Sequence, residues 1–297
     1  MKTLFWIQGL SCGANTQSFL CMEQKDLFKD LFENIEVLYH PLSDKSLEES
    51  VRLLLKDEKE LDILIVEGAI GKSIRHVCSY SFSNIVKILS SKAKYVIALG
   101  DCASFGGIHA KAGTHITGLQ FRFKEFGGLL GKTFLSKSSY PVINIAGCPA
   151  HPEWVYYVIS ALLEDKNIEL DEFNRPKDIF RYLTHNGCLR NEYFEWKVES
   201  KEFGTKEGCL FYELGCRGPL THSSCNKILW NGVSSKTRAG TPCVGCTEFD
   251  FPRENMFKTE QAVGLPKELP LGVSKKGYIL LAGIAKTFAP DRLKDKL

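Results

Sequence analysis

Residues 95–102, YVIALGDC, contain the pattern that decides the fold: a short apolar run ends in glycine and is followed at once by a cysteine. Four further short apolar runs lie in the first half of the chain, at residues 4–8, 35–39, 63–66 and 142–145. Apolar runs that alternate with amphipathic stretches are typical of a parallel sheet covered by helices. We therefore expect an α/β fold in which these five runs form a parallel sheet.

The amphipathic stretches between the runs space apolar residues three and four positions apart, as helices packed on a sheet do. They predict helices at residues 47–59, 73–91 and 152–163. After about residue 165 the strand-like runs become fewer and loop signals more frequent. We expect two domains, residues 1–165 and 166–297. The second, smaller and irregular, should need cross-links because it would bury little apolar surface alone.

The composition excludes several classes of protein. A chain of 297 residues, 44% hydrophobic and 25% charged, is long enough for two folded domains and is not disordered. Its net charge of +3, with no run of five like charges, argues against nucleic acid or an anionic membrane as the main partner. The longest apolar stretch is short of the roughly 20 residues that a membrane-spanning helix needs. We expect a cytoplasmic protein, with any membrane attachment made through another subunit.

Eleven cysteines are an unusually high number for a chain of this kind. Because cytoplasmic thiols stay reduced, metal binding is favoured over disulfides. Three predicted strands are followed within a few residues by a cysteine, namely Cys12, Cys102 and Cys148. The carboxyl ends of parallel strands meet at one edge of a sheet, so these thiols should converge there. Together they could hold an iron–sulfur cluster, or each could be a small buried residue.

Six further cysteines lie in the predicted second domain. His185, Cys188, Cys209 and Cys216 offer one imidazole and three thiolates. Cys225, Cys243 and Cys246 form a second group of three thiolates. Structural zinc sites share the Cys-x-x-Cys spacing, so a zinc-binding structural protein is an alternative interpretation.

Several motifs occur in a fixed order: WIQGLSC at 6–12, VEG at 66–68, GDCASFGGI at 100–108, GCPAHP at 147–152, GCRGP at 215–219 and the cysteine-containing segment 225–246. In this order the chain resembles, over nearly its whole length, the small electron-transfer subunit of [NiFe] hydrogenases. Residues 221–231, THSSCNKILWN, are similar to the cytoplasmic uptake and hydrogen-sensing branch in particular.

The resemblance implies a flavodoxin-like first domain with a proximal iron–sulfur cluster, held by Cys12, Cys102 and Cys148. It implies a distal [4Fe-4S] cluster held by His185, Cys188, Cys209 and Cys216, and a medial [3Fe-4S] cluster held by Cys225, Cys243 and Cys246. The nickel–iron centre would belong to a large partner subunit. We expect hydrogen oxidation by a dimer of heterodimers or a larger assembly, with electrons passed to an acceptor protein or quinone. A regulatory hydrogen-sensing hydrogenase is the alternative.

One position departs from the family pattern. Family members usually have Cys-x-x-Cys in the first motif, whereas this chain has asparagine, Asn15, at the second position. A neutral amide is a poor iron ligand beside thiolates. We expect a proximal [3Fe-4S] cluster with Asn15 near its vacant corner, in preference to a [4Fe-4S] cluster in which Asn15 or solvent completes the fourth iron. A three-iron cluster of high potential would favour hydrogen oxidation.

Four other residues are candidates for a role at the site. Glu67, at a predicted strand end, could relay protons or contact the large subunit, or it could simply bind a neighbouring turn. His151 could donate a hydrogen bond to a cluster or lie in a solvated loop. Cys78, in a predicted helix, is most simply a packed thiol, and Cys21 is a weak candidate for the missing ligand.

Overall fold

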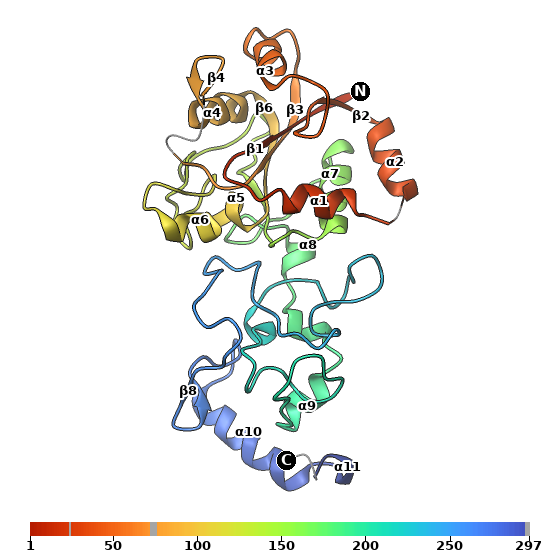
Figure 1. Ribbon diagram of the computed structural model, residues 1–297, viewed down its shortest axis with the longest axis vertical. Helices are drawn as coiled ribbons and strands as arrows, with labels where there is room; N and C mark the ends of the chain where they lie inside the picture. Colours follow the sequence, from red (N-terminus) through yellow and green to blue (C-terminus); the bar gives the residue numbers. More distant parts are fainter. Residues whose placement is uncertain (24, 72–75, 295–297) are drawn as a thin grey trace. The chain divides into compact units, whose positions relative to one another are not determined.

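The computed structural model describes residues 1–23, 25–71 and 76–294, and the chain divides into two compact units. The first comprises Met1–Ile179 together with Thr247–Phe251, and the second comprises Phe180–Cys246 and Pro252–Leu297 (Figure 1). The short segment Thr247–Phe251 therefore belongs to the first unit, although the residues on both sides of it belong to the second.

A five-stranded parallel sheet forms the centre of the first unit. In spatial order, its strands are β2 (Ile35–Tyr39), β1 (Lys2–Gln8), β3 (Leu61–Glu67), β6 (Ala93–Leu99) and β7 (Ile143–Ile145). The predicted α/β class and all five predicted strands are confirmed. The central strands are buried on both faces, which explains why they read as continuous apolar runs rather than alternating ones.

Helices cover both faces of this sheet (Figure 1). They are α1 (Ala14–Leu20), α2 (Lys25–Glu33), α3 (Leu47–Leu55), α4 (Phe82–Lys92), α5 (Asp101–Phe105), α6 (Gly107–Ala112) and α7 (Pro152–Leu163). Side chains from alternate strand positions, such as Phe5, Leu64 and Val96, pack with α3 and α4 in one apolar core. Helix α7 has the predicted bounds, and α3 begins where predicted but ends four residues early at Leu55.

The helix predicted at residues 73–91 is wrong in its first part. Residues 73–75 lie outside the described residues, and a hairpin of β4 (His76–Val77) and β5 (Tyr80–Ser81) precedes α4. Cys78 and Ser79 form its turn with positive φ angles, a conformation that a helix does not allow. Cys78 is nevertheless packed against the core, and its thiol donates a hydrogen bond of 3.2 Å to the carbonyl of Glu48.

The second unit contains little regular structure, as predicted. Its short elements are η1 (Thr184–Gly187), α9 (Asn191–Glu195), η2 (Gly218–Leu220), β8 (Gln261–Ala262), β9 (Leu265–Pro266) and α11 (Asp291–Lys294), with α8 (Lys177–Phe180) at the junction of the units. The longest element is α10 (Lys275–Phe288). None of the helices in the described part of the chain has the length and apolar character needed to cross a bilayer.

Glu67, the last residue of β3, connects the sheet to the turn that follows β1. Its carboxylate is fully buried. It accepts hydrogen bonds from Trp6 Nε1 (3.2 Å), Gln8 Nε2 (3.0 Å), Ser11 Oγ (2.9 Å), Asn15 N (3.2 Å) and Thr16 Oγ1 (2.6 Å). Burial by itself raises the pKa of Glu67, but the hydrogen bonds outweigh it and leave the pKa below its ordinary value. The interpretation of Glu67 as a strand-end carboxylate bonded to a neighbouring turn is confirmed.

Replacement of this carboxylate tests the network. We expect Glu67→Gln to lower the free energy of unfolding at pH 7 by about 2–4 kcal/mol, because the amide nitrogen would face buried donors that then lack an acceptor. Folding lowers the pKa of Glu67, so its stabilising effect is complete above the unfolded-state pKa and is lost as the pH falls through the folded-state pKa. Urea unfolding from pH 7 to about pH 3 measures both effects.

The matched control is Glu58→Gln, which removes an exposed carboxylate and should change stability by less than about 0.5 kcal/mol. If Glu67→Gln were as stable as the wild-type protein at pH 7, the network would not have the role assigned to it.

Candidate functional site

The carboxyl edge of the sheet brings the three cysteines of the first unit to neighbouring loops. Cys12 follows β1, Cys102 lies in α5 directly after β6, and Cys148 follows β7. Burial raises the pKa of the Cys102 thiol to about 12, and the negative potentials of Asp101, Cys148 and Cys12 add to the effect. The three cysteines therefore lie after strands that end at the same edge of the sheet.

The backbone holds two of these loops together. The amide of Asp101 donates a hydrogen bond of 2.8 Å to the carbonyl of Gly147, which joins the loop of Cys102 to the loop of Cys148. Gly107 lies against the Cys102 thiol with a φ of +49°, and a Cβ atom there would come within 2.8 Å of the sulfur. A glycine is required at this position because both the backbone conformation and the close approach exclude a side chain.

Asn15 is almost buried and binds two of the strand-end loops. Its Oδ1 accepts a hydrogen bond of 2.8 Å from the amide of Ala150, and its Nδ2 donates one of 3.4 Å to Glu67 Oε1. A Cβ atom on Gly100 would meet Nδ2 at 2.4 Å, so the amide also packs on the loop after β6. Asn15 thus lies among the loops that carry Cys102 and Cys148.

Asp101 is a feature of this edge that the sequence analysis missed. It is only 2% exposed, and within the described ranges neither carboxylate oxygen has a hydrogen-bond partner. Burial raises the pKa of Asp101 well above its ordinary value, and the nearby Asp250 and Glu248 raise it further. No pattern in the sequence marks it, because an acidic residue in the first turn of a helix is usually solvated.

Two other candidate residues, His151 and Cys21, lie at the ends of helices. His151 caps the N-terminus of α7, where its Nδ1 accepts a hydrogen bond of 3.2 Å from the amide of Glu153. Cys21 is an exposed residue at the C-terminal end of α1. The helix therefore lies between Cys21 and the turn that carries Cys12.

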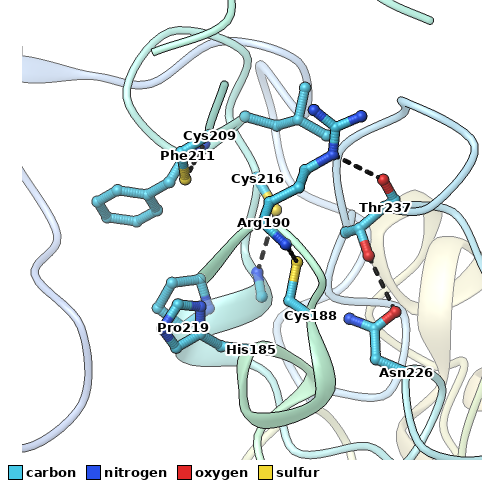
Figure 2. Close-up of a pocket in the computed structure, with 11 residues that line it drawn as sticks. His185, Cys188, Arg190, Cys209, Phe211, Cys216, Pro219, Asn226 and Thr237 are labelled. Carbon is cyan, nitrogen blue, oxygen red and sulfur yellow. Dashed lines mark hydrogen bonds between the residues drawn. The ribbon is translucent and has the colours of Figure 1, made fainter. Parts of the chain in front are cut away.

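In the second unit, a small pocket is lined by the imidazole and three thiols that the sequence groups together. Figure 2 shows His185, Cys188, Cys209 and Cys216 around this pocket. They come from η1, from the residue after it and from two separate loops, so the tertiary structure brings them together across 31 positions of sequence. Cys209 and Cys216 are buried, and Cys188 is partly buried.

Backbone amides point at the sulfur atoms of this pocket. The Cys188 sulfur accepts from the amide of Arg190 (3.4 Å), the Cys209 sulfur from that of Phe211 (3.4 Å), and the Cys216 sulfur from those of Gly218 (3.5 Å) and Cys243 (3.3 Å). Hydrogen bonds of this kind stabilise negative charge on sulfur. At Cys209, the hydrogen bond from Phe211 lowers the pKa of the thiol and so opposes the effect of burial, which raises this pKa to about 12.

The imidazole and a buried arginine complete the surroundings of the pocket. Burial lowers the pKa of His185, and Lys197 lowers it further, so the ring is held neutral, the form that binds metals. Arg190 is 5% exposed, and its guanidinium donates to backbone carbonyls of four residues, Thr205, Glu207, Gly208 and Thr237. Arg190 fixes the loop before Cys209, a role that the sequence analysis did not predict because the partners are backbone atoms.

Cys225, Cys243 and Cys246, the third group of candidate ligands, also belong to the second unit and come after Cys216 in the sequence. Burial raises the pKa of Cys225 to about 12, and the potential of Cys243 adds to it. Burial also raises the pKa of Cys243, while hydrogen bonds from Gly245, Thr221 and Thr184 lower it. Since Cys243 also donates its amide to the Cys216 sulfur, the second and third groups are directly connected.

Within residues 1–23, 25–71 and 76–294, no three His, Cys, Asp or Glu side chains converge as they would around a single metal ion. The thiolates of an iron–sulfur cluster lie farther apart than those around one ion, because each sulfur ligates a different iron.

Two family models match the chain. Residues 180–258 match the C-terminal region of the NiFe/NiFeSe hydrogenase small subunit, and residues 12–162 match the 20 kDa subunit of NADH ubiquinone oxidoreductase. The first match contains all the cysteines of the second unit, and the second contains Cys12, Cys102 and Cys148.

Individual relatives agree with these matches. The periplasmic [NiFe] hydrogenase small subunit 1 of Nitratidesulfovibrio vulgaris is 32% identical over 84% of this chain and 79% of its own length. The periplasmic [NiFe] hydrogenase small subunit of Solidesulfovibrio fructosivorans is 28% identical over 84% and 78%. Among solved structures, the actinobacterial-type NiFe-hydrogenase of Ralstonia eutropha H16 is similar with a TM-score of 0.76 and 25% identity, over 100% of this chain and 92% of that one.

The family matches, the identity over most of both chains and the shared fold give one conclusion. The chain belongs to the small subunits of [NiFe] hydrogenases, which function in hydrogenase enzymes together with a large subunit.

Proposed function

We propose that this chain relays electrons from a nickel–iron centre in the large subunit through three iron–sulfur clusters to an acceptor protein or quinone, during hydrogen oxidation. The observation that carries the proposal is the pocket in which one neutral imidazole and three thiols meet, with backbone amides directed at each sulfur. Soft sulfur donors in a partly dehydrated, hydrogen-bonding environment are the ligands that iron–sulfur clusters use.

The donor sets fit the proposed clusters. His185, Cys188, Cys209 and Cys216 supply four ligands, which suits a distal [4Fe-4S] cluster. Cys225, Cys243 and Cys246 supply three thiolates, which suits a medial [3Fe-4S] cluster. When bound, the clusters would supply one-electron redox steps. The chain itself would hold the clusters. Because several of the thiols are buried, water has limited access to them. Hydrogen bonds from backbone amides would stabilise the negative charge on the sulfurs.

For the proximal cluster we propose Cys12, Cys102 and Cys148 as ligands of a [3Fe-4S] cluster, in preference to a [4Fe-4S] cluster. The hydrogen bonds of Asn15 support this choice. Its amide oxygen, the atom that would ligate iron, already accepts a hydrogen bond from Ala150, and its nitrogen donates to Glu67. The side chain is therefore held by protein atoms at both ends.

Elemental analysis of the purified complex tests the cluster set. We expect about ten irons per small subunit, beyond the iron of the large subunit, from two three-iron clusters and one cubane, with acid-labile sulfide present. About eleven irons would indicate a complete proximal cubane. A colourless protein that contains zinc and no sulfide would contradict the proposal and favour the zinc-binding structural protein.

A substitution at Asn15 tests the proximal cluster. We expect Asn15→Cys to supply the fourth thiolate, remove one three-iron EPR signal from the oxidised protein and shift the proximal midpoint potential downward by on the order of 100 mV or more. The measurement is a redox titration followed by EPR.

Asn15→Ala is the control, because it removes the same hydrogen bonds without adding a thiolate. It should keep the three-iron signal. If the spectrum of Asn15→Cys matched that of the wild-type complex, the assignment of this cluster would be wrong.

Turnover distinguishes the enzyme from the hydrogen sensor. We propose the uptake branch, so the complex should reduce a dye with hydrogen at about 1–1,000 turnovers per second, the ordinary range for enzymes. A rate far below this range, together with binding to a signalling kinase, would instead support the regulatory alternative.

The proposed location is cytoplasmic and the proposed assembly is a dimer of heterodimers or larger. The first of these is a prediction from the sequence alone. Relatives whose names describe them as periplasmic are among the matches, so the comparisons do not support a cytoplasmic location over a periplasmic one.

A further inference from the structure

Helix α10 exposes an apolar face that neither the fold nor the candidate sites use. Leu280, Ile284 and Phe288 are spaced four residues apart and therefore share one face of the helix, with Leu281 beside them. The exposed fraction of the side chain is 65% for Leu280, 55% for Leu281, 46% for Ile284 and 70% for Phe288. With Ile279, which is 51% exposed, five large apolar side chains are exposed on the 14 residues of α10, more than the scattered exposure that soluble proteins commonly show.

The opposite side of α10 is already occupied by its own unit. Tyr278, Ala285 and Ala289 are each about 5% exposed or less. The Nζ atom of Lys197 lies 4.7 Å from the centroid of the Tyr278 ring, and Tyr278 belongs to the core of the second unit. The helix is therefore fixed by one face and presents the other outward, at the periphery of the second unit in Figure 1.

The charge of the chain is concentrated in the same segment. Residues 275–297 contain six basic and two acidic side chains, a net charge of +4, whereas residues 1–274 have a net charge of −1. Two of the lysines, Lys275 and Lys276, are exposed in the first turn of α10, and the helix contains no acidic residue. The overall charge of +3 conceals this asymmetry.

We propose that α10 docks on an anionic lipid surface, lying in the plane of the membrane. Leu280, Leu281, Ile284 and Phe288 would enter the boundary between head groups and acyl chains, while the lysines contact the head-group phosphates. An amphipathic helix with basic residues beside its apolar face has the chemistry that anionic bilayers bind. With 14 residues, α10 is about 21 Å long, which suits an in-plane position.

Charge also decides between this occupant and a second copy of the chain. Two copies joined through α10 would bring together two segments that each carry a net charge of +4, and like charges at a contact oppose association. An anionic surface instead attracts the +4 segment of every copy of the chain in a larger assembly. In this proposal the chain itself binds the membrane through α10, whichever cysteines hold the clusters.

Vesicle cosedimentation of the intact small–large complex tests the proposal. We expect binding to vesicles of equal parts phosphatidylglycerol and phosphatidylcholine to be at least about tenfold tighter than to phosphatidylcholine alone, and to weaken as salt is raised. The variant Leu280→Ser/Ile284→Ser/Phe288→Ser removes the apolar face, and Lys275→Glu/Lys276→Glu reverses the adjacent charge. Each should reduce binding by about tenfold or more.

The matched control is Lys201→Glu/Lys206→Glu, which makes the same change in net charge at two exposed lysines outside α10. It should change vesicle binding by less than about threefold. Hydrogen-dependent dye reduction should be the same in all the complexes, which establishes that each variant is folded.

Absence of a preference for anionic vesicles, or equal binding by the wild-type complex and Lys275→Glu/Lys276→Glu, would overturn the proposal. It would also be overturned if light scattering showed that the apolar variant halves the mass of the assembly while no complex binds vesicles. In that case the face would be a contact between copies of the chain.

Discussion

The buried carboxylate of Glu67 is the interaction on which the first site depends. It lies at the end of β3, between the strand ends that lead to Cys12 and Cys102, and it receives six hydrogen bonds from β1, the following turn and the start of α1. A carboxylate inside a protein is costly unless it is satisfied in this way. Its donors are therefore fixed in position, and with them the backbone on both sides of Cys12.

Asn15 extends this constraint from Glu67 to the loop after β7. One end of its amide binds the carboxylate and the other binds the amide of Ala150, two residues beyond Cys148. Thiolates held at one edge of a sheet would repel one another, so their loops must be held by other interactions. In the first unit these interactions are the buried carboxylate, the asparagine amide and the hydrogen bond between Asp101 and Gly147.

In the second unit, the loops that carry the thiols are held in place without a sheet. Its thiols are buried or partly buried in a region of short helices and loops. Arg190 fixes one loop there through backbone carbonyls, and four backbone amides point at three sulfurs. Helix α10, the longest helix in the described part of this unit, packs by one face and leaves the other exposed. The core of this unit is therefore built mainly from loops, and its longest helix contributes one face to the core and the other to the surface.

The sequence by itself determined the sheet, because apolar runs are local properties, and the spacing of the cysteines suggested which of them could act together. The five strands, the bounds of α7 and the meeting of His185 with three cysteines could all be predicted in this way. Only the tertiary structure decided what Glu67, Asn15 and Arg190 do, since their partners are remote in sequence and include backbone atoms. It also decided that the apolar residues of α10 face outward, because burial depends on what packs against a helix and not on its own composition.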